Sequence, residues 1–194
     1  MYLAAGRRTE AARLLSLAVA MLATRMDHFG GALALPDASL AVFFLAGLWL
    51  RAAWAFPALL LLALGVDLVA LALQGLGADC LSPAYPFLMA AYGALWSAGR
   101  RVRASAQDAT PQSILAGGAI AVSLAAVLAF GISNLSWFAF SGYFDSAALG
   151  DYVGRTLPQA PRYVGVTLAY ALLGMAARWL LAAPQRPAGA TSVR

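Results

Sequence analysis

Six apolar runs separated by short polar stretches make up most of the chain. The runs cover about residues 11–26, 38–55, 57–75, 85–99, 111–131 and 161–182. A helix of about 20 apolar residues crosses the ~30 Å hydrocarbon core of a bilayer, and most of the runs approach that length. The fourth run is the shortest, so its outer end is expected to begin within the membrane interface. The pattern predicts an all-α polytopic membrane protein with six transmembrane helices.

The segments between the runs complete this organisation. Residues 132–160 form the longest connection, which is rich in aromatic residues and is expected to hold a short helix near 145–153. Thr110 followed by Pro111 is typical of a helix N-cap and first helical residue. Residues 184–194 form a polar tail, so residues 1–183 are expected to be a single six-helix domain.

The composition agrees with a membrane protein, and the distribution of basic residues predicts its orientation in the membrane. Hydrophobic residues make up 62% of the chain and charged residues 11%, whereas soluble domains have about half and about a quarter. Six spans place both termini on one side, which then collects ten of the thirteen basic residues: Arg7, Arg8, Arg13, Arg51, Arg100, Arg101, Arg103, Arg178, Arg186 and Arg194. The other side collects Arg25, Arg155 and Arg162. The positive-inside rule therefore predicts cytoplasmic termini and a cytoplasmic tail.

The residue types that are missing exclude several chemistries. All thirteen basic residues are arginine, so the chain has neither the lysine of a phosphate-binding Walker loop nor one for Schiff-base chemistry. Cys80 and His28 are the only residues of their kinds. Iron–sulfur clusters, structural zinc sites and two-histidine metalloprotease sites are therefore impossible within one chain.

The stretch from Gly75 to Pro86 is the first place to look for specific chemistry. Cys80 lies there in a Gly- and Pro-containing loop, next to Asp79 and near Ser82. A thiolate is a nucleophile and a soft metal ligand. One cysteine cannot hold a bare metal ion, but it can be the axial ligand of a metal already held by a macrocycle. His28 is either a second ligand or a polar residue of an interfacial loop.

Asp67 and Tyr85 flank this stretch. Asp67 lies roughly 12 Å below the outer end of the third run, at 1.5 Å per helical residue. A carboxylate at that depth is costly unless it is paired, hydrated or protonated; desolvation favours the neutral form, which is a hydrogen-bond donor. Asp67 therefore either makes a structural hydrogen bond to another helix or lines an outward-facing cavity. Tyr85 begins an aromatic stripe with Met89, Tyr92 and Trp96, and its hydroxyl needs a partner.

Asp67 followed by Cys80-Leu81-Ser82-Pro83-Ala84-Tyr85 resembles a known family. Together with the six runs, this pattern is similar to the S-components of energy-coupling-factor (ECF) transporters for vitamins, and within them to the BtuM group of solitary S-components. The resemblance covers essentially the whole chain. It implies an S-component-like bundle in the bacterial inner membrane, with the Cys80 loop facing the periplasm. The implied function is binding and uptake of cobalamin (vitamin B12), with cobalt ligated by Cys80 in a base-off mode.

The resemblance also implies roles for other residues. Thiolate-dependent removal of an upper ligand such as cyanide would use Cys80, supported by Asp67 and Tyr85. His28 is the weaker candidate for a cobalt ligand. The aromatic residues Trp137, Phe138 and Tyr143 are expected to cover the edge of the corrin ring. The small residues of the first run, Ala12, Ser16 and Ala20, are expected to dock on an energy-coupling membrane subunit that carries ATPases.

Three other interpretations remain open at the level of sequence. The chain can be a haem-handling membrane protein that uses Cys80 or His28 as an axial ligand. It can be an S-component for a different, smaller vitamin. It can also be a structural membrane subunit without a ligand, in which Cys80 is inert.

Overall fold

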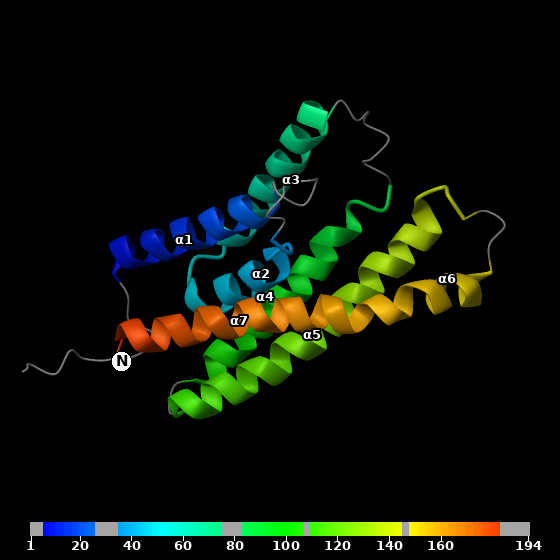
Figure 1. The fold of residues 1–194 in the computed structure, drawn as a ribbon. Helices are drawn as coiled ribbons and strands as arrows, with labels where there is room; N and C mark the ends of the chain where they lie inside the picture. Colours follow the sequence, from blue (N-terminus) through cyan, green and yellow to red (C-terminus); the bar gives the residue numbers. More distant parts are fainter. Residues whose placement is uncertain (1–5, 26–34, 75–82, 107–108, 145–147, 183–194) are drawn as a thin grey trace, which may run out of the picture.

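The computed structural model of the chain describes residues 6–25, 35–74, 83–106, 109–144 and 148–182. Every regular element within these ranges is helical, which confirms the all-α prediction (Figure 1). The helices are α1 (Arg7–Arg25), α2 (Ser39–Trp49), α3 (Ala55–Gln74), α4 (Phe87–Ser105), α5 (Pro111–Phe140), α6 (Leu149–Thr156), the 3-10 turn η3 (Leu157–Gln159) and α7 (Ala160–Ala182).

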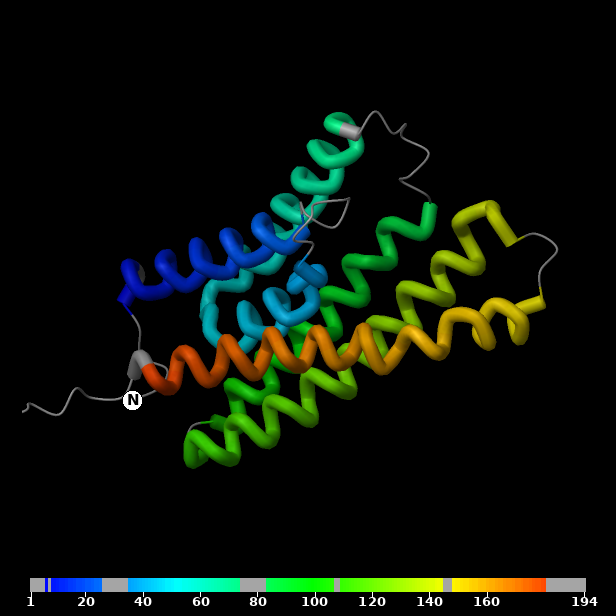
Figure 2. The backbone as a smooth tube through the Cα atoms, viewed as in Figure 1, coloured from blue at the N-terminus to red at the C-terminus, as the bar shows by residue number. Residues whose placement is uncertain are grey.

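Within the described residues, three helical segments are long and apolar enough to cross a membrane. They are Ala55–Leu73, Pro111–Phe140 and the continuous rod Leu149–Leu180, which joins α6, η3 and α7 (Figure 2). Only 33%, 33% and 17% of these hydrophobic windows are buried inside the protein. Their remaining apolar surface faces outward, as it does where a helix contacts lipid. The structure is thus compatible with a membrane protein.

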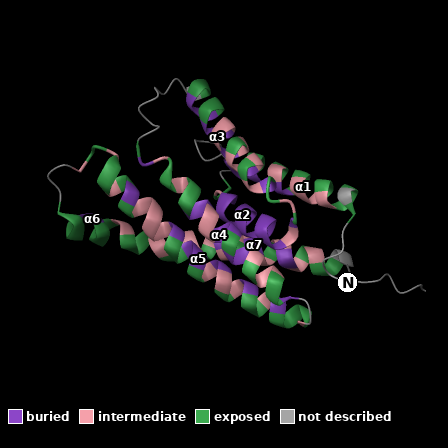
Figure 3. Cartoon of the chain, turned by 180° about the vertical axis from the view of Figure 1, so that it is seen from behind, coloured by how far each residue is buried: buried purple, intermediate pink, exposed green. Residues whose placement is uncertain are grey.

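Helix α2 forms the centre of the bundle. Its residues from Ser39 to Leu48 are buried, and it appears as the purple core of Figure 3. Phe43 stacks on Tyr92 of α4 with ring centroids 4.3 Å apart. Gly47 and Gly99 lie where a Cβ atom would collide with the facing backbone, so they let α2 and α4 approach closely.

The helix boundaries differ from the predicted runs at several places. Helix α4, which was expected to be the shortest span and to end at 99, continues to Ser105, and α1 begins at Arg7, before the expected start at 11. The run 38–55 is interrupted after Trp49, because Leu50 is extended (φ −95°, ψ 134°) and α3 begins only at Ala55. Helix α5 continues nine residues beyond the expected end at 131, because no proline interrupts residues 132–141. Gly142, with a φ of +79°, follows the C-cap Ser141. Its start follows the prediction: the Thr110 hydroxyl accepts a hydrogen bond from the Ser113 amide at 3.2 Å.

The two ends of the bundle carry different polar groups. The start of α1, the end of α4, the start of α5 and the end of α7 gather at one end, on the left in Figure 1. There Arg13 and Arg103 donate to the carbonyl oxygens of Trp49 and Leu50, respectively, which terminate α2. At the opposite end lie the last turn of α1, the start of α4 and the end of α5. This second end holds the candidate site.

Candidate functional site

A buried arginine joins four helices near the second end of the bundle. Arg25, in the last turn of α1, is only 7% exposed. Its Nε and Nη2 atoms donate to the two carboxylate oxygens of Asp67, each at 2.6 Å. Its Nη1 atom donates to Asp37 Oδ2 at 3.2 Å, to Ser39 Oγ at 3.0 Å and to the Tyr92 hydroxyl at 2.9 Å. One guanidinium thus links α1 to α2, α3 and α4.

This geometry is that of a strong, desolvated ion pair. The planar fork of arginine matches the two oxygens of a carboxylate, and charge-assisted bonds of this kind are short. The side chains of Arg25 and Asp67 are 9% and 12% exposed, so little water screens the pair. Removing one partner of such a pair leaves a buried charge uncompensated. The resulting loss in the free energy of unfolding is larger than the net stabilisation that the intact pair provides.

Asp67 therefore differs from the sequence-based expectation of a neutral donor. It accepts hydrogen bonds from Arg25 and from the Tyr85 hydroxyl, the latter at 2.6 Å. Three donors on one carboxyl group are the arrangement of an ionised acceptor. Of the two roles considered for Asp67, the structure shows the hydrogen bond to neighbouring helices. The partner, Arg25, is 42 residues distant in sequence, and no local pattern indicated the contact.

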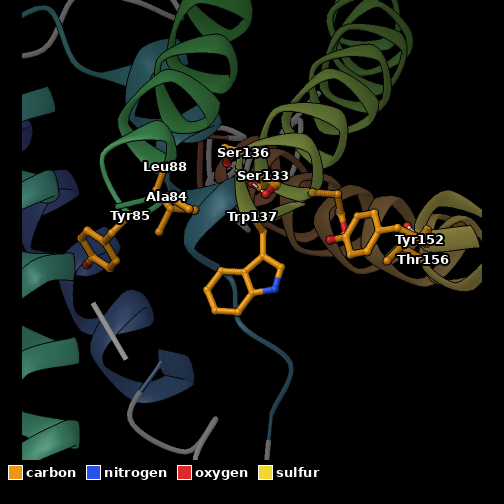
Figure 4. Close-up of a pocket in the computed structure, with 9 residues that line it drawn as sticks. Ala84, Tyr85, Leu88, Ser133, Ser136, Trp137, Tyr152 and Thr156 are labelled. Carbon is orange, nitrogen blue, oxygen red and sulfur yellow. Dashed lines mark hydrogen bonds between the residues drawn. The ribbon is translucent and has the colours of Figure 1, made fainter. Parts of the chain in front are cut away.

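A cavity of about 460 Å³ lies beside this network (Figure 4). Its walls come from the start of α4, the last turns of α5, and α6. The lining residues are Ala84, Tyr85, Leu88, Ser133, Asn134, Ser136, Trp137, Tyr152 and Thr156. Its volume lies within the ~300–1,000 Å³ of small-molecule sites. Tyr85 belongs both to the cavity wall and to the Asp67 network, so it connects the two.

The lining combines aromatic faces with polar groups, of which Asn134, Ser136 and Thr156 are hydrogen-bonded to backbone carbonyls of their own helices. The indole of Trp137 lies between Tyr85 and Tyr152 in Figure 4. The Tyr152 hydroxyl donates to Asn134 Oδ1 at 3.2 Å, which fixes α6 against α5. An apolar wall with a few fixed polar groups is typical of sites for organic ligands.

The aromatic residues singled out in the sequence have separate positions. Trp137 lines the cavity, and Tyr143, which is 68% exposed, stacks on it with centroids 5.7 Å apart. Phe138 instead packs against Phe144 and Tyr152, at 5.6 and 5.1 Å. Trp137 and Phe138 lie in α5 itself and not in a connection.

Cys80 and His28 lie outside the described residues, so the structure gives no contact for either. Asn134, Tyr152 and Arg25 were not predicted as site residues. A signal for the first existed: Ser133, Ser136 and Trp137 have the i, i+3, i+4 spacing of one helix face, next to Asn134. Within the described ranges, no group of three or more His, Cys, Asp or Glu residues is placed to hold a metal ion.

The fold and the site together describe an all-helical protein with membrane-compatible helices and a ligand-sized cavity near one end of the bundle. No protein-family model and no curated protein matches the chain significantly.

Proposed function

We propose that the protein binds cobalamin at the periplasmic face of the bacterial inner membrane and takes part in its uptake. The observation that carries this proposal is the double role of Tyr85. Tyr85 lies five residues after Cys80, lines the cavity and donates to Asp67. A ligand in this cavity would therefore lie against the segment that leads directly to the Cys80 thiol.

The proposed topology has six spans, cytoplasmic termini and a periplasmic Cys80 loop. It is supported by the grouping of arginines. Arg13 and Arg103 lie together at the end of the bundle where α2 terminates, and Arg25 lies near the other end among two carboxylates. The ion pairs of Arg25 with Asp67 and Asp37 offset its charge at the second end, so the larger positive charge lies at the first end.

The proposed chemistry needs one protein ligand to cobalt. The corrin ring supplies four equatorial nitrogens, so the Cys80 sulfur would occupy one axial position and displace the nucleotide base. A thiolate donates strongly to cobalt and weakens the bond to the ligand opposite. That upper ligand would leave as cyanide with its electron pair, so the cobalt keeps its oxidation level. Asp67, fixed by Arg25, would hold Tyr85 in position beside the ring.

The size and shape of the cavity support a ligand that is only partly enclosed. A corrinoid is larger than 460 Å³, so the cavity would receive one edge of it. Trp137 would face that edge, and the exposed ring of Tyr143 would extend the aromatic surface toward solvent. Aromatic faces suit an extended, apolar ring system and exclude water from it.

A partner surface is proposed on α1. Ala12 and Ser16 are exposed there, one turn apart, and Ala20 is half-buried. Small residues at this spacing allow another helix to approach closely in lipid. An energy-coupling membrane subunit with its ATPases would dock on this face.

The visible absorption spectrum of the purified protein tests the proposal. Wild-type protein from cells supplied with cyanocobalamin should carry a corrinoid whose spectrum is that of thiolate-ligated cobalt. Cys80→Ser should lose that spectrum, while Ser82→Ala, a matched change in the same loop, should keep it. An unchanged spectrum in Cys80→Ser would refute cobalt ligation. A Soret band would select the haem-handling alternative.

A further inference from the structure

The end of the bundle opposite to the candidate site carries a cluster of arginines around the last residues of α2. Arg13 Nη1 donates to the Trp49 carbonyl at 3.3 Å, and Arg103 donates to the Leu50 carbonyl. These contacts hold two guanidinium groups at the break between α2 and α3. Arg51 lies in that break and is exposed.

Positive charge exceeds negative charge in this cluster. The pKa of Arg103 is lowered by partial burial and, beyond that, by the positive charges of Arg100 and Arg51, whereas Glu10 acts in the opposite direction. The Glu10 carboxylate also accepts from the backbone amides of Arg51 and Ala52, so part of its hydrogen-bonding capacity is already used. The guanidinium groups of Arg51, Arg100 and Arg103 thus repel one another electrostatically, and the carboxylate of Glu10 is the negative charge near them.

One of these guanidinium groups has an unused donor. The Nη1 atom of Arg100 is buried and has no hydrogen-bond partner among the described residues. A buried donor of a charged group that lacks an acceptor is costly. Together with the mutual repulsion of the arginines, this unpaired donor favours binding of an anion at this end of the protein.

An apolar groove of about 580 Å³ adjoins the arginine cluster. Its walls are one face of α1 and the connection from α2 to α3. The lining residues include Glu10, Leu15, Ala18, Leu50 and Trp54. Leu50 and Glu10 belong to the groove and also contact the cluster, so the two features are continuous. Leu15 and Trp54 are 65% and 62% exposed, which leaves the groove open at its side.

We propose that the cluster and the groove form a binding site for an anionic phospholipid. The phosphate would lie against Arg51, Arg100 and Arg103, and an acyl chain would fill the groove along α1. Only an amphiphile satisfies both features: a free phosphate would leave the apolar walls exposed, and an apolar helix would leave the arginines without an anion. Trp54 beside the groove suits the boundary between acyl chains and headgroups.

Native mass spectrometry of the full-length, detergent-solubilised protein tests this site without any use of cobalamin. Phosphatidylglycerol and phosphatidylcholine with the same acyl chains would be titrated separately. The wild-type protein should bind phosphatidylglycerol at least tenfold more tightly than phosphatidylcholine. Arg51→Gln and Arg100→Gln should each weaken that binding about tenfold, as expected for one charge-assisted contact. Arg101→Gln is the matched control for Arg100→Gln. It removes the same charge from helix α4, at an exposed position next to Arg100.

A second variant tests the groove independently of the charges. Ala18→Phe should weaken binding of phosphatidylglycerol by filling the groove, with every arginine in place. Thermal unfolding in phosphatidylcholine micelles checks that each variant is folded. Equal affinity for the two lipids, or an equal loss in Arg101→Gln, would overturn the proposal. So would full competition by inorganic phosphate, since the cluster would then be a simple anion site, or an unchanged affinity in Ala18→Phe, since the groove would then hold a partner other than lipid.

Discussion

Replacing Arg25 by methionine should be among the most destabilising single changes in the protein. Arg25 donates five hydrogen bonds, to Asp67, Asp37, Ser39 and Tyr92. Methionine fills a similar volume but leaves the carboxylates of Asp67 and Asp37 next to each other without a cation. Loss of one partner of a buried ion pair costs about 3–5 kcal/mol. We therefore expect a loss of that size in the free energy of unfolding.

Asp67→Asn should cost less than Arg25→Met. The amide oxygen still accepts from Arg25, and Asp37, at 3.2 Å, still balances the charge. The substitution removes the negative charge opposite Arg25 and replaces one accepting oxygen by an NH2 group, which predicts a cost of about 1–3 kcal/mol. Because the two residues share one network, the double variant should cost less than the sum of the single variants.

Reversible unfolding in mixed micelles, followed by circular dichroism, measures these free energies. Arg155→Met is the matched control, because it is the same substitution at an exposed arginine. It should lie within about 0.5 kcal/mol of wild type. Strict additivity of the two single variants, or a cost below about 1 kcal/mol for Arg25→Met, would refute the account of Arg25 as a buried, charged centre of the bundle.

Three further predictions concern the cavity and the helix packing. Tyr85→Phe keeps the ring in the cavity wall but removes the bond to Asp67, so it should lower the free energy of unfolding by about 1.5–3 kcal/mol and weaken corrinoid binding in an equilibrium titration; unchanged values of both would contradict the connection between network and cavity. Trp137→Ala should weaken corrinoid binding in the same titration without changing the spectrum of bound cobalt, and a changed spectrum would mean that the indole acts on the metal environment. Gly99→Ala should destabilise the protein by about 1–3 kcal/mol, because the added Cβ atom overpacks α2 against α4. Gly131→Ala, where a Cβ atom meets nothing within 4 Å, should be neutral or stabilising in thermal unfolding. Equal effects of the two substitutions would contradict the close approach of the two helices.

The hydrophobic pattern was sufficient for the fold class but not for all helix ends. A long apolar run indicates a helix, because its side chains must either pack inside the protein or face lipid along the whole length of the run. The break after Trp49 is not visible in that pattern, since Leu50, Ala52 and Trp54 continue the apolar run. It depends on tertiary contacts, in which arginines from α1 and α4 bind the last carbonyls of α2.

The candidate site was predictable only in its local parts. Asp67 and Tyr85 stood out because a carboxylate and a hydroxyl at such depth need partners. Their shared partner network was not predictable, because Arg25 is 42 residues distant from Asp67 and the sequence assigned it only to the outer side of the membrane. Tyr85 and Trp137 of the cavity wall were predicted as site residues, but Asn134 and Tyr152 were not. Their contact needs the last two turns of α5 to stay helical, which the hydrophobic pattern did not indicate.

The most direct test of the proposed function is the visible spectrum of corrinoid-loaded protein, compared between wild type and Cys80→Ser after purification under identical conditions. Ligation by Cys80 predicts a spectrum of thiolate-bound, base-off corrinoid in wild type and its loss in the serine variant. The same corrinoid spectrum in both proteins, or no corrinoid in wild type, would contradict it.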